Sequence, residues 1–293
     1  MRFYILALFA VLFWSGNFIV GKYISSDIHP IQLALYRWFL VFLILMPYMI
    51  IRFKNIYAQL KKHYIILTVQ GTLAIAGFNT LIYFGFQTTT ATNALIINSS
   101  IPIIIVVFSS IILKQHIEKI QVGGILLSTF GVLYLVSKGN IDNIVQLKFT
   151  DGDIWIILAC FIWALYTVLL KYKPQDLNGF EFFGLLTFIG TLILFIIFLF
   201  SNQTINLKIL YKKELMLSII YIVLFPSLLS YSFWNISTAK LTPNVTGQFS
   251  HLMPIFGSFL AYLFLDEILY LYHYIGILLI ALGIYFSIFY RKK

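Results

Sequence analysis

The chain has 293 residues, of which 61% are hydrophobic and only 10% are charged, and its net charge is +10. A soluble domain carries about 25% charged residues because its surface faces water. This composition therefore excludes a soluble globular protein and indicates one that is surrounded by lipid. The basic residues stand in short clusters at the ends of apolar stretches rather than in one patch. That pattern is typical of membrane proteins and argues against nucleic acid as a partner.

Ten apolar runs follow one another along the chain, each close to the length of about 20 residues that a membrane-spanning helix needs. They cover residues 3–24, 30–51, 64–86, 92–113, 120–137, 153–172, 180–200, 215–236, 243–265 and 270–290. The first run follows Arg2 as in a signal peptide, but no small-residue cleavage site comes after it, so we interpret it as an uncleaved span. The sequence predicts an all-α integral membrane protein with ten transmembrane helices. The longest loops are expected at 52–63, 138–152 and 201–214.

The distribution of lysine and arginine sets the expected orientation. With the N-terminus inside, thirteen basic residues fall on the inner side and six on the outer side, while Arg37 lies within a span. We therefore expect both termini to be cytoplasmic. The richness in Ile, Phe, Tyr and Lys indicates an AT-rich bacterial genome, so we expect the protein in the inner (plasma) membrane of a bacterium.

The two halves of the chain resemble each other. At a shift of 149 residues Trp14 and Lys22 match Trp163 and Lys171, and at a shift of 152 Pro102, Gly124 and Gly131 match Pro254, Gly276 and Gly283. Such co-linear matches favour duplication over chance and predict two repeat units, residues 1–137 and 153–293. Each unit has an odd number of spans, so the two would enter the bilayer from opposite faces. Inverted repeats of this kind are a transporter design, in which one shared site opens alternately to each side.

The repeated motifs resemble the EamA family of ten-span proteins in the drug/metabolite transporter superfamily. They are Phe13-Trp14-Ser15-Gly16-Asn17, Ile162-Trp163-Ala164, Arg37 after Pro30, and Met253-Pro254 through Leu265-Asp266-Glu267 to Gly276 and Gly283. The chain departs from the family at Lys114-Gln115, where an acidic residue is usual, and at Leu186, the position equivalent to Arg37. The resemblance implies a carrier of small solutes, often an exporter of amino acids or related metabolites.

A substrate site is expected near the bilayer midplane, where polar side chains face water, substrate or each other. Trp14 and Asn17 share one helix face, as do Trp163 and Tyr166, and such groups combine a stacking surface with hydrogen bonds. Helix packing explains these residues equally well. Asn79, Tyr83, Tyr231 and Trp234 lie in the third span of each half and Asn98 precedes Pro102; interhelical hydrogen bonds or a fixed kink are the alternatives for them.

Two ionisable residues stand in mid-span. Arg37 is suited to binding a substrate carboxylate, but it can also reach the outer headgroups or pair within the protein. His251 changes charge near neutral pH, although a histidine at a polar helix interface is often structural. All acidic residues fall in loops or at span ends, so proton coupling would require His251 or the substrate itself.

These residues form the predicted substrate-binding set: Trp14, Asn17, Arg37, Asn79, Tyr83, Asn98, Trp163, Tyr166, Tyr231, Trp234 and His251. No cofactor or metal is predicted, and no catalytic residue. The expected partners are a small-molecule substrate and membrane lipid, and the protein is plausible as a monomer. The function predicted is a secondary carrier of small organic solutes that works by alternating access. The alternatives are an integral-membrane transferase acting on a lipid or metabolite and a membrane scaffold. A transferase usually gathers Asp, His or Arg at one membrane face, and the sequence contains no such cluster. The inverted repeat argues against a scaffold.

Overall fold

A computed structural model describes residues 1–140, 142–146, 148–205, 211–264 and 268–288 of the chain, which form helices and loops with no strand among them. The first half contains α1 (Arg2–Ile24), α2 (Pro30–Ile51), α3 (Phe53–Gly71), the π-helical segment η1 (Thr72–Gly77), α4 (Phe78–Thr88), α5 (Ala91–Asn98), α6 (Ile101–Leu113) and α7 (Lys119–Val136). The short helix α8 (Asp142–Val145) lies in the connection. The second half contains α9 (Asp151–Leu169), η2 (Leu170–Tyr172), α10 (Gly179–Phe200), α12 (Lys213–Ile222), the π-helical η3 (Val223–Leu229), α13 (Ser230–Leu241), α14 (Pro243–Gln248), η4 (Phe249–Leu252), α15 (Met253–Phe264) and α16 (Leu271–Ile288).

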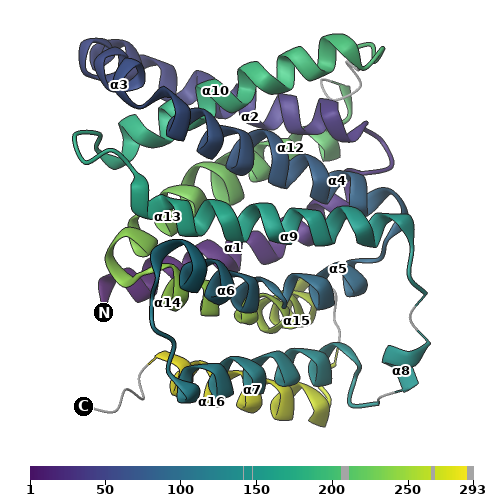
Figure 1. The fold of residues 1–293 in the computed structure, drawn as a ribbon. Coiled ribbons are helices and arrows are strands. Elements are labelled where there is room, and N and C mark those ends of the chain that lie inside the picture. The colour runs from purple at the N-terminus through teal and green to yellow at the C-terminus, as the bar shows by residue number, and fades with distance from the viewer. Residues whose placement is uncertain (141, 147, 206–210, 265–267, 289–293) are drawn as a thin grey trace.

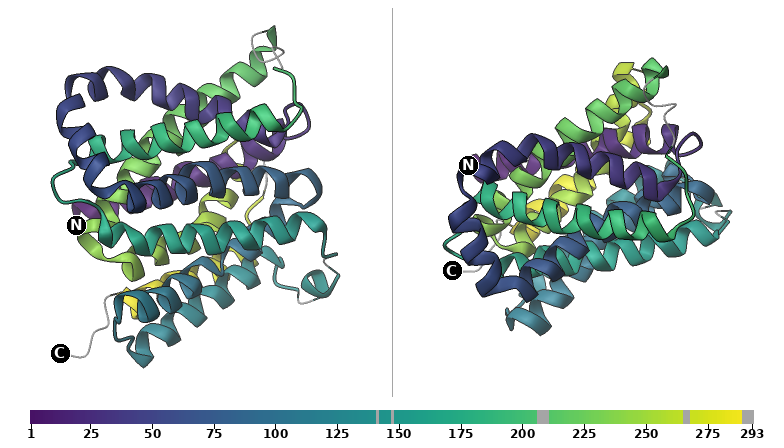
Figure 2. Two further views of the ribbon diagram at one scale, coloured as in Figure 1. Left: turned by 45° about the horizontal axis from the view of Figure 1, so that its top comes forward. Right: turned by 90° about the horizontal axis from the view of Figure 1, so that it is seen from above.

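Nine helical stretches in the described part of the chain are long and apolar enough to cross a membrane. The tenth expected span, 243–265, is present as α14, η4 and α15 up to Phe264, and residue 265 lies outside the described residues. The expected ten-helix arrangement in two repeats is thereby confirmed. Figure 1 shows α2 and α10 at one end of the stack of helices, α1 and α9 in its middle, and α7 with α16 at the other end. Figure 2 shows from two further sides that the helices share one long direction.

The expected loop at 52–63 is wrong. Helix α3 begins at Phe53 and continues through this stretch, with a bend at His63, where φ is −124° and ψ is 25°. Lysine, glutamine and alanine favour helix despite their low hydropathy. Ile56 is buried and Leu60, one turn later, is partly buried, so this basic segment is an amphipathic turn of helix with its apolar side on the bundle.

The helices are interrupted at equivalent positions of the two halves. At the shift of 152 residues, η1 corresponds to residues 224–229, which lie within η3, and the starts of α5 and α6 correspond to the starts of α14 and α15. Pro226 lies within η3 and lacks the backbone N–H that a regular turn uses, but η1 forms the same kind of turn without a proline. The π turns therefore belong to the repeated fold and not to proline alone.

Helices α7 and α16 are in backbone contact through glycine. A Cβ added at Gly124 would lie 2.6 Å from the carbonyl oxygen of Gly283, and one added at Gly276 would lie 3.3 Å from the carbonyl oxygen of Gly131. Gly124 thus faces Gly283 and Gly276 faces Gly131, so these repeat-equivalent helices run antiparallel. Small residues permit this approach in a membrane, where close packing is a main source of helix association.

Candidate functional site

A small pocket lies between the two repeats. Its wall comes from α1, α4, α5 and α6 of the first half and from α9, η4 and α15 of the second. Five of the predicted residues line it, namely Trp14, Asn17, Asn79, Asn98 and Trp163. The pocket volume of about 20 Å³ holds about one water molecule. The central site is therefore closed in this structure.

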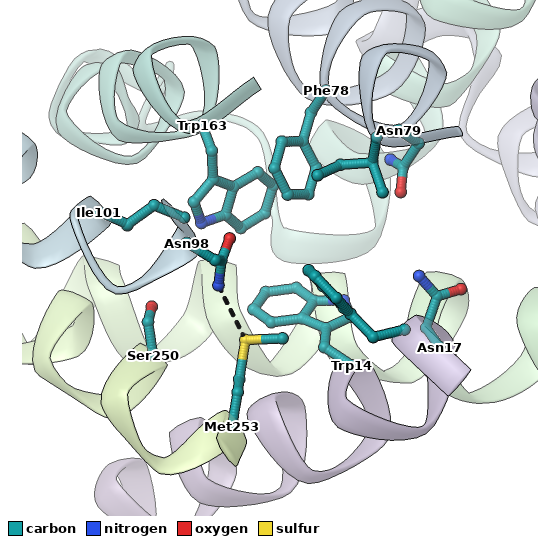
Figure 3. A pocket seen from close by; sticks show the side chains of 11 residues that line it. Trp14, Asn17, Phe78, Asn79, Asn98, Ile101, Trp163, Ser250 and Met253 are labelled. Carbon is teal, nitrogen blue, oxygen red and sulfur yellow. Dashed lines mark hydrogen bonds between the residues drawn. The ribbon is translucent and has the colours of Figure 1, made fainter. Parts of the chain in front are cut away.

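The pocket wall is aromatic and amide-rich. Figure 3 shows the indoles of Trp14 and Trp163 close together, with Asn98 on one side of them above Met253 and Asn79 on the other side next to Phe78. The rings of Trp14 and Trp163 meet edge to face at a centroid distance of 5.0 Å, a preferred aromatic arrangement. Asn98 Nδ2 donates to the sulfur of Met253 at 3.3 Å, which is a weak acceptor. This wall presents flat apolar surfaces and amide groups to a ligand.

Three predicted residues do not line the pocket but pack against the residues that do, namely Tyr166, Tyr231 and Trp234. Tyr231 and Trp234 pack against Trp14 at centroid distances of 5.8 and 5.1 Å. Tyr166 packs against Trp163 at 5.3 Å. Their polar atoms bond within the protein: Tyr166 Oη donates to Asn235 Oδ1 at 2.6 Å, Trp234 Nε1 to Thr167 Oγ1 at 3.3 Å, and Asn79 Nδ2 to Tyr231 Oη at 2.7 Å. Direct substrate contact for these three stays a prediction.

The two π-helical segments offer carbonyl oxygens to the opposite repeat. A π turn disturbs the regular pattern of backbone hydrogen bonds and is frequent at functional sites. The carbonyl oxygen of Ala74 in η1 accepts a hydrogen bond from Tyr231 Oη at 2.9 Å. The repeat-equivalent carbonyl of Pro226 in η3 accepts from Trp14 Nε1 at 2.8 Å and from Arg37 Nη2 at 3.3 Å. Each π segment is thus tied to a side chain of the other half, directly beside the pocket.

Arg37 is fully buried on the inward face of α2. Its Nε donates to Ser227 Oγ at 2.6 Å, and its Nη1 donates to Tyr83 Oη at 2.8 Å and to Asn17 Oδ1 at 3.4 Å. The guanidinium carbon of Arg37 lies 5.0 Å from the centre of the Trp38 ring. The expected alternative in which Arg37 reaches the headgroups is wrong, because its helix face also carries buried residues and points into the bundle. Pairing within the protein is what the structure shows.

The partners of Arg37 are all neutral. Among the described residues the two ion pairs are Arg52 with Glu181 and Lys212 with Asp27, and neither includes Arg37. A buried charge without a counter-ion is costly, and neutral hydrogen bonds offset only part of that cost. Asn17, which accepts from Arg37, also lines the pocket. The guanidinium therefore lies one side chain away from the space that a ligand would fill.

His251 lies next to the pocket residue Ser250, but it does not line the pocket itself. Its Nε2 lies 2.9 Å from the carbonyl oxygen of Ser99. Because a carbonyl only accepts, Nε2 carries the proton in this bond. Nδ1 is buried and has no hydrogen-bond partner among the described residues. Ser99 and His251 are equivalent positions of the two repeats, 152 residues apart.

Acidic side chains join the two halves at one end of the bundle. Asp153 at the start of α9 is buried and accepts from Thr89 Oγ1, from Asn93 Nδ2 at 3.3 Å and from Thr150 N at 2.7 Å. Elsewhere, Lys212 Nζ lies 2.9 Å from Asp27, and that carboxylate raises the pKa of the lysine above its ordinary value. These contacts join the halves near the helix ends, far along the helices from the pocket.

The sequence interpretation missed the apolar part of the pocket. The additional lining residues are Phe18, Phe78, Ile82, Ile101, Ser250 and Met253. A search for polar mid-span residues passes over most of them. Ile82 lies three residues after Asn79 and four after Phe78, which is helical spacing, so following the face of Asn79 along α4 would have found Ile82.

Two repeats with interrupted helices that meet around a closed pocket define a multi-pass membrane transporter. The chain belongs to the EamA-like transporter family, whose sequence profile matches residues 1–137 and 150–289, and the expected family resemblance is confirmed. It is 26% identical over 284 residues to the uncharacterized transporter YyaM of Bacillus subtilis, covering 97% of this chain and 92% of that protein. It is 26% identical over 292 residues to an uncharacterized transporter of Archaeoglobus fulgidus, covering 97% and 96%. A solved crystal structure with 14% sequence identity shares the fold with a TM-score of 0.73, covering 97% of this chain and 95% of that one.

Proposed function

We propose that this protein is a secondary carrier of small organic solutes that bear a carboxylate, amino acids or related metabolites in particular, and that it works by alternating access with export as its main direction. It acts as a monomer in the inner membrane of a bacterium with both termini in the cytoplasm. The observation that carries this proposal is the position of the pocket, which lies where equivalent residues of the two repeats touch each other.

Three pairs of repeat-equivalent residues are in contact. They are Trp14 with Trp163, Asn79 with Tyr231, and Ser99 with His251. Equivalent residues meet only near the axis that relates two repeats, so the pocket lies at that axis. The antiparallel contact of α7 with α16 supports an axis in the membrane plane. When two inverted repeats exchange their conformations, a site on this axis opens to opposite sides in turn.

The carboxylate follows from Arg37. A substrate anion that displaces the Asn17 amide would give the buried guanidinium the counter-ion it lacks, and arginine binds carboxylates through two parallel hydrogen bonds. The ammonium group of an amino acid would find amide oxygens in the pocket, and an apolar side chain would pack against the indole rings of Trp14 and Trp163. A zwitterionic solute with an apolar side chain fits this wall best.

Counterflow in sealed vesicles tests the proposal. Vesicles containing the purified protein are loaded with a pool of amino acids and small organic acids, and the uptake of each labelled compound against its own gradient is measured. We expect at least one carboxylate-bearing compound to show counterflow that protein-free vesicles lack. A folded protein that exchanges none of the pool contradicts the carrier.

Replacing His251 by Gln is expected to abolish any stimulation of transport by an imposed pH gradient. Gln keeps an N–H donor for the Ser99 carbonyl but has no site like the unpartnered Nδ1, the one position where His251 can take up a second proton. Uptake with and without a gradient measures the effect, and counterflow at equal pH on both sides controls for folding and is expected to persist. An unchanged gradient dependence would mean that His251 plays no part in coupling.

A further inference from the structure

A second hollow opens between the α9–α10 connection at Lys173, the start of α10, and α13. Its volume is about 200 Å³, far more than that of the central pocket. The residues that matter are Lys173, Phe180, Phe182, Asn235, Ile236 and Lys240. Figure 1 shows the α9–α10 connection at the same end of the bundle as the N-terminus. We call this hollow the Lys173–Lys240 crevice.

The polar groups of the crevice are mainly donors. Lys173 and Lys240 contribute ammonium groups, and none of the described residues that line the crevice is acidic. Asn235 is only 8% exposed, its Oδ1 accepts the bond from Tyr166, and its Nδ2 is buried without a hydrogen-bond partner. A buried amide donor left without an acceptor destabilises the protein. The crevice therefore lacks an acceptor, and an anionic group would supply one.

Lys173 has no free carboxylate beside it. Its Nζ donates to the backbone carbonyls of Pro174 and Leu177 and lies 5.6 Å from the centre of the Phe182 ring. Glu181 is the acidic residue whose charge acts on it, and Glu181 is already paired with Arg52 at 2.7 Å. Burial lowers the pKa of Lys173 below its ordinary value, as expected for an ammonium group that has lost water without gaining a full counter-ion.

Apart from Ser232, the rest of the crevice is apolar. Phe180 and Ile236 are 56% and 39% exposed on the outer surface of two membrane-spanning helices, so in a bilayer they face lipid. The lysines stand at the ends of the spans, at the depth of the headgroups. A ligand for this crevice therefore combines an anionic head with an apolar body and reaches the site from within the bilayer.

We propose that the Lys173–Lys240 crevice binds an anionic phospholipid of the surrounding leaflet, with its phosphate at Lys173, Lys240 and Nδ2 of Asn235 and an acyl chain along Phe180 and Ile236. Basic pockets between transmembrane helices on the cytoplasmic side bind anionic lipid headgroups in this manner. The repeat-equivalent positions in the first half are Ile24 for Lys173 and Tyr83 for Asn235. The crevice is thus a property of the second half and not a by-product of the duplication.

A lipid bound in the crevice would affect the central pocket through Asn235. Asn235 holds the hydroxyl of Tyr166, and Tyr166 packs on the pocket residue Trp163. A lipid phosphate that fixes the Asn235 amide would also fix the position of Tyr166. Binding of the lipid itself does not depend on which solute the protein carries, so it is tested without a transport assay.

Native mass spectrometry on protein released from a neutral detergent measures the binding, with dioleoyl phosphatidylglycerol as the anionic probe and dioleoyl phosphatidylcholine as the zwitterionic one. We expect the wild-type protein to retain phosphatidylglycerol preferentially. The double variant Lys173→Gln/Lys240→Gln should lose about tenfold or more of this retention, the effect of one or two charge-assisted hydrogen bonds. Asn235→Asp should lose as much, because it keeps the acceptor for Tyr166 while it replaces the free donor with a negative charge.

Lys171→Gln is the matched control, since Lys171 is an exposed neighbour that does not line the crevice. It should retain phosphatidylglycerol as the wild type does, and thermal melting in the lipid-free detergent checks that all variants are folded. Equal retention by the wild type, the double variant and Asn235→Asp would overturn the proposal. Soluble glycerol 3-phosphate that displaces the lipid at equal concentration would overturn the lipid as the occupant and identify a site for soluble phosphates.

Discussion

Arg37→Gln should lower the affinity for a carboxylate-bearing substrate by roughly ten- to a hundredfold, the equivalent of one charged hydrogen-bonded pair at about 1.5–3 kcal/mol. The reason is that the guanidinium is fully buried and bonded only to neutral groups. The substrate anion would therefore be its first partner of opposite charge. Counterflow at graded substrate concentrations measures the change. The melting temperature of the empty protein should fall little, because the substitution also removes the cost of burying an unpaired charge.

Two comparisons separate this role from a structural one. Tyr83→Phe removes one neutral partner of Arg37 but leaves the charge in place, so it should change affinity far less. An amide analogue of the substrate, which has no negative charge, should be transported equally well by the wild type and by Arg37→Gln. If the variant loses the acid and the amide alike, or keeps its affinity for the acid, the carboxylate assignment is wrong.

Gly124→Ala should destabilise the protein by about 1–3 kcal/mol, as overpacking of a tight contact does. An added Cβ would lie 2.5 Å from the backbone nitrogen of Ser287 and 2.6 Å from the carbonyl oxygen of Gly283. Both atoms belong to the backbone of α16, so they cannot move aside as a flexible side chain would. Separation of α7 from α16 is the only relief. Thermal melting or denaturant unfolding in detergent measures the loss.

The neighbouring glycine provides the control. A Cβ added at Gly123 would meet nothing within 4 Å, and alanine favours helix over glycine by about 1 kcal/mol. Gly123→Ala should therefore leave the protein equally or slightly more stable. Similar losses for the two variants would contradict the close α7–α16 contact, because the substitutions differ only in which side of the same helix they enlarge.

The sequence determined the class and the symmetry of this protein. Apolar runs about as long as a bilayer is thick predict the spans without any knowledge of their packing, since lipid forces the backbone bonds into each helix. The matches of Trp14 with Trp163 and of Gly124 with Gly276 revealed the duplication, because a repeat leaves residues in the same order. Polar residues in mid-span pointed to the candidate pocket, which five of them line, because the membrane tolerates such residues in few other places.

The tertiary structure decided how those residues are used. Whether Arg37 reaches the headgroups or the bundle depends on how α2 is rotated, and contacts with α10, η3 and α4 fix that rotation. The π turns of η1 and η3 and the helical path of 53–63 depend on partners far along the chain, such as Tyr231 for the carbonyl of Ala74. The apolar runs and repeated motifs predict the spans and the two repeats, and they place Trp14, Asn98 and Trp163 at the pocket but not its apolar residues such as Phe78 and Met253. Packing decided which of the predicted residues face the pocket, because contacts with neighbouring helices determine which side of each helix points inward.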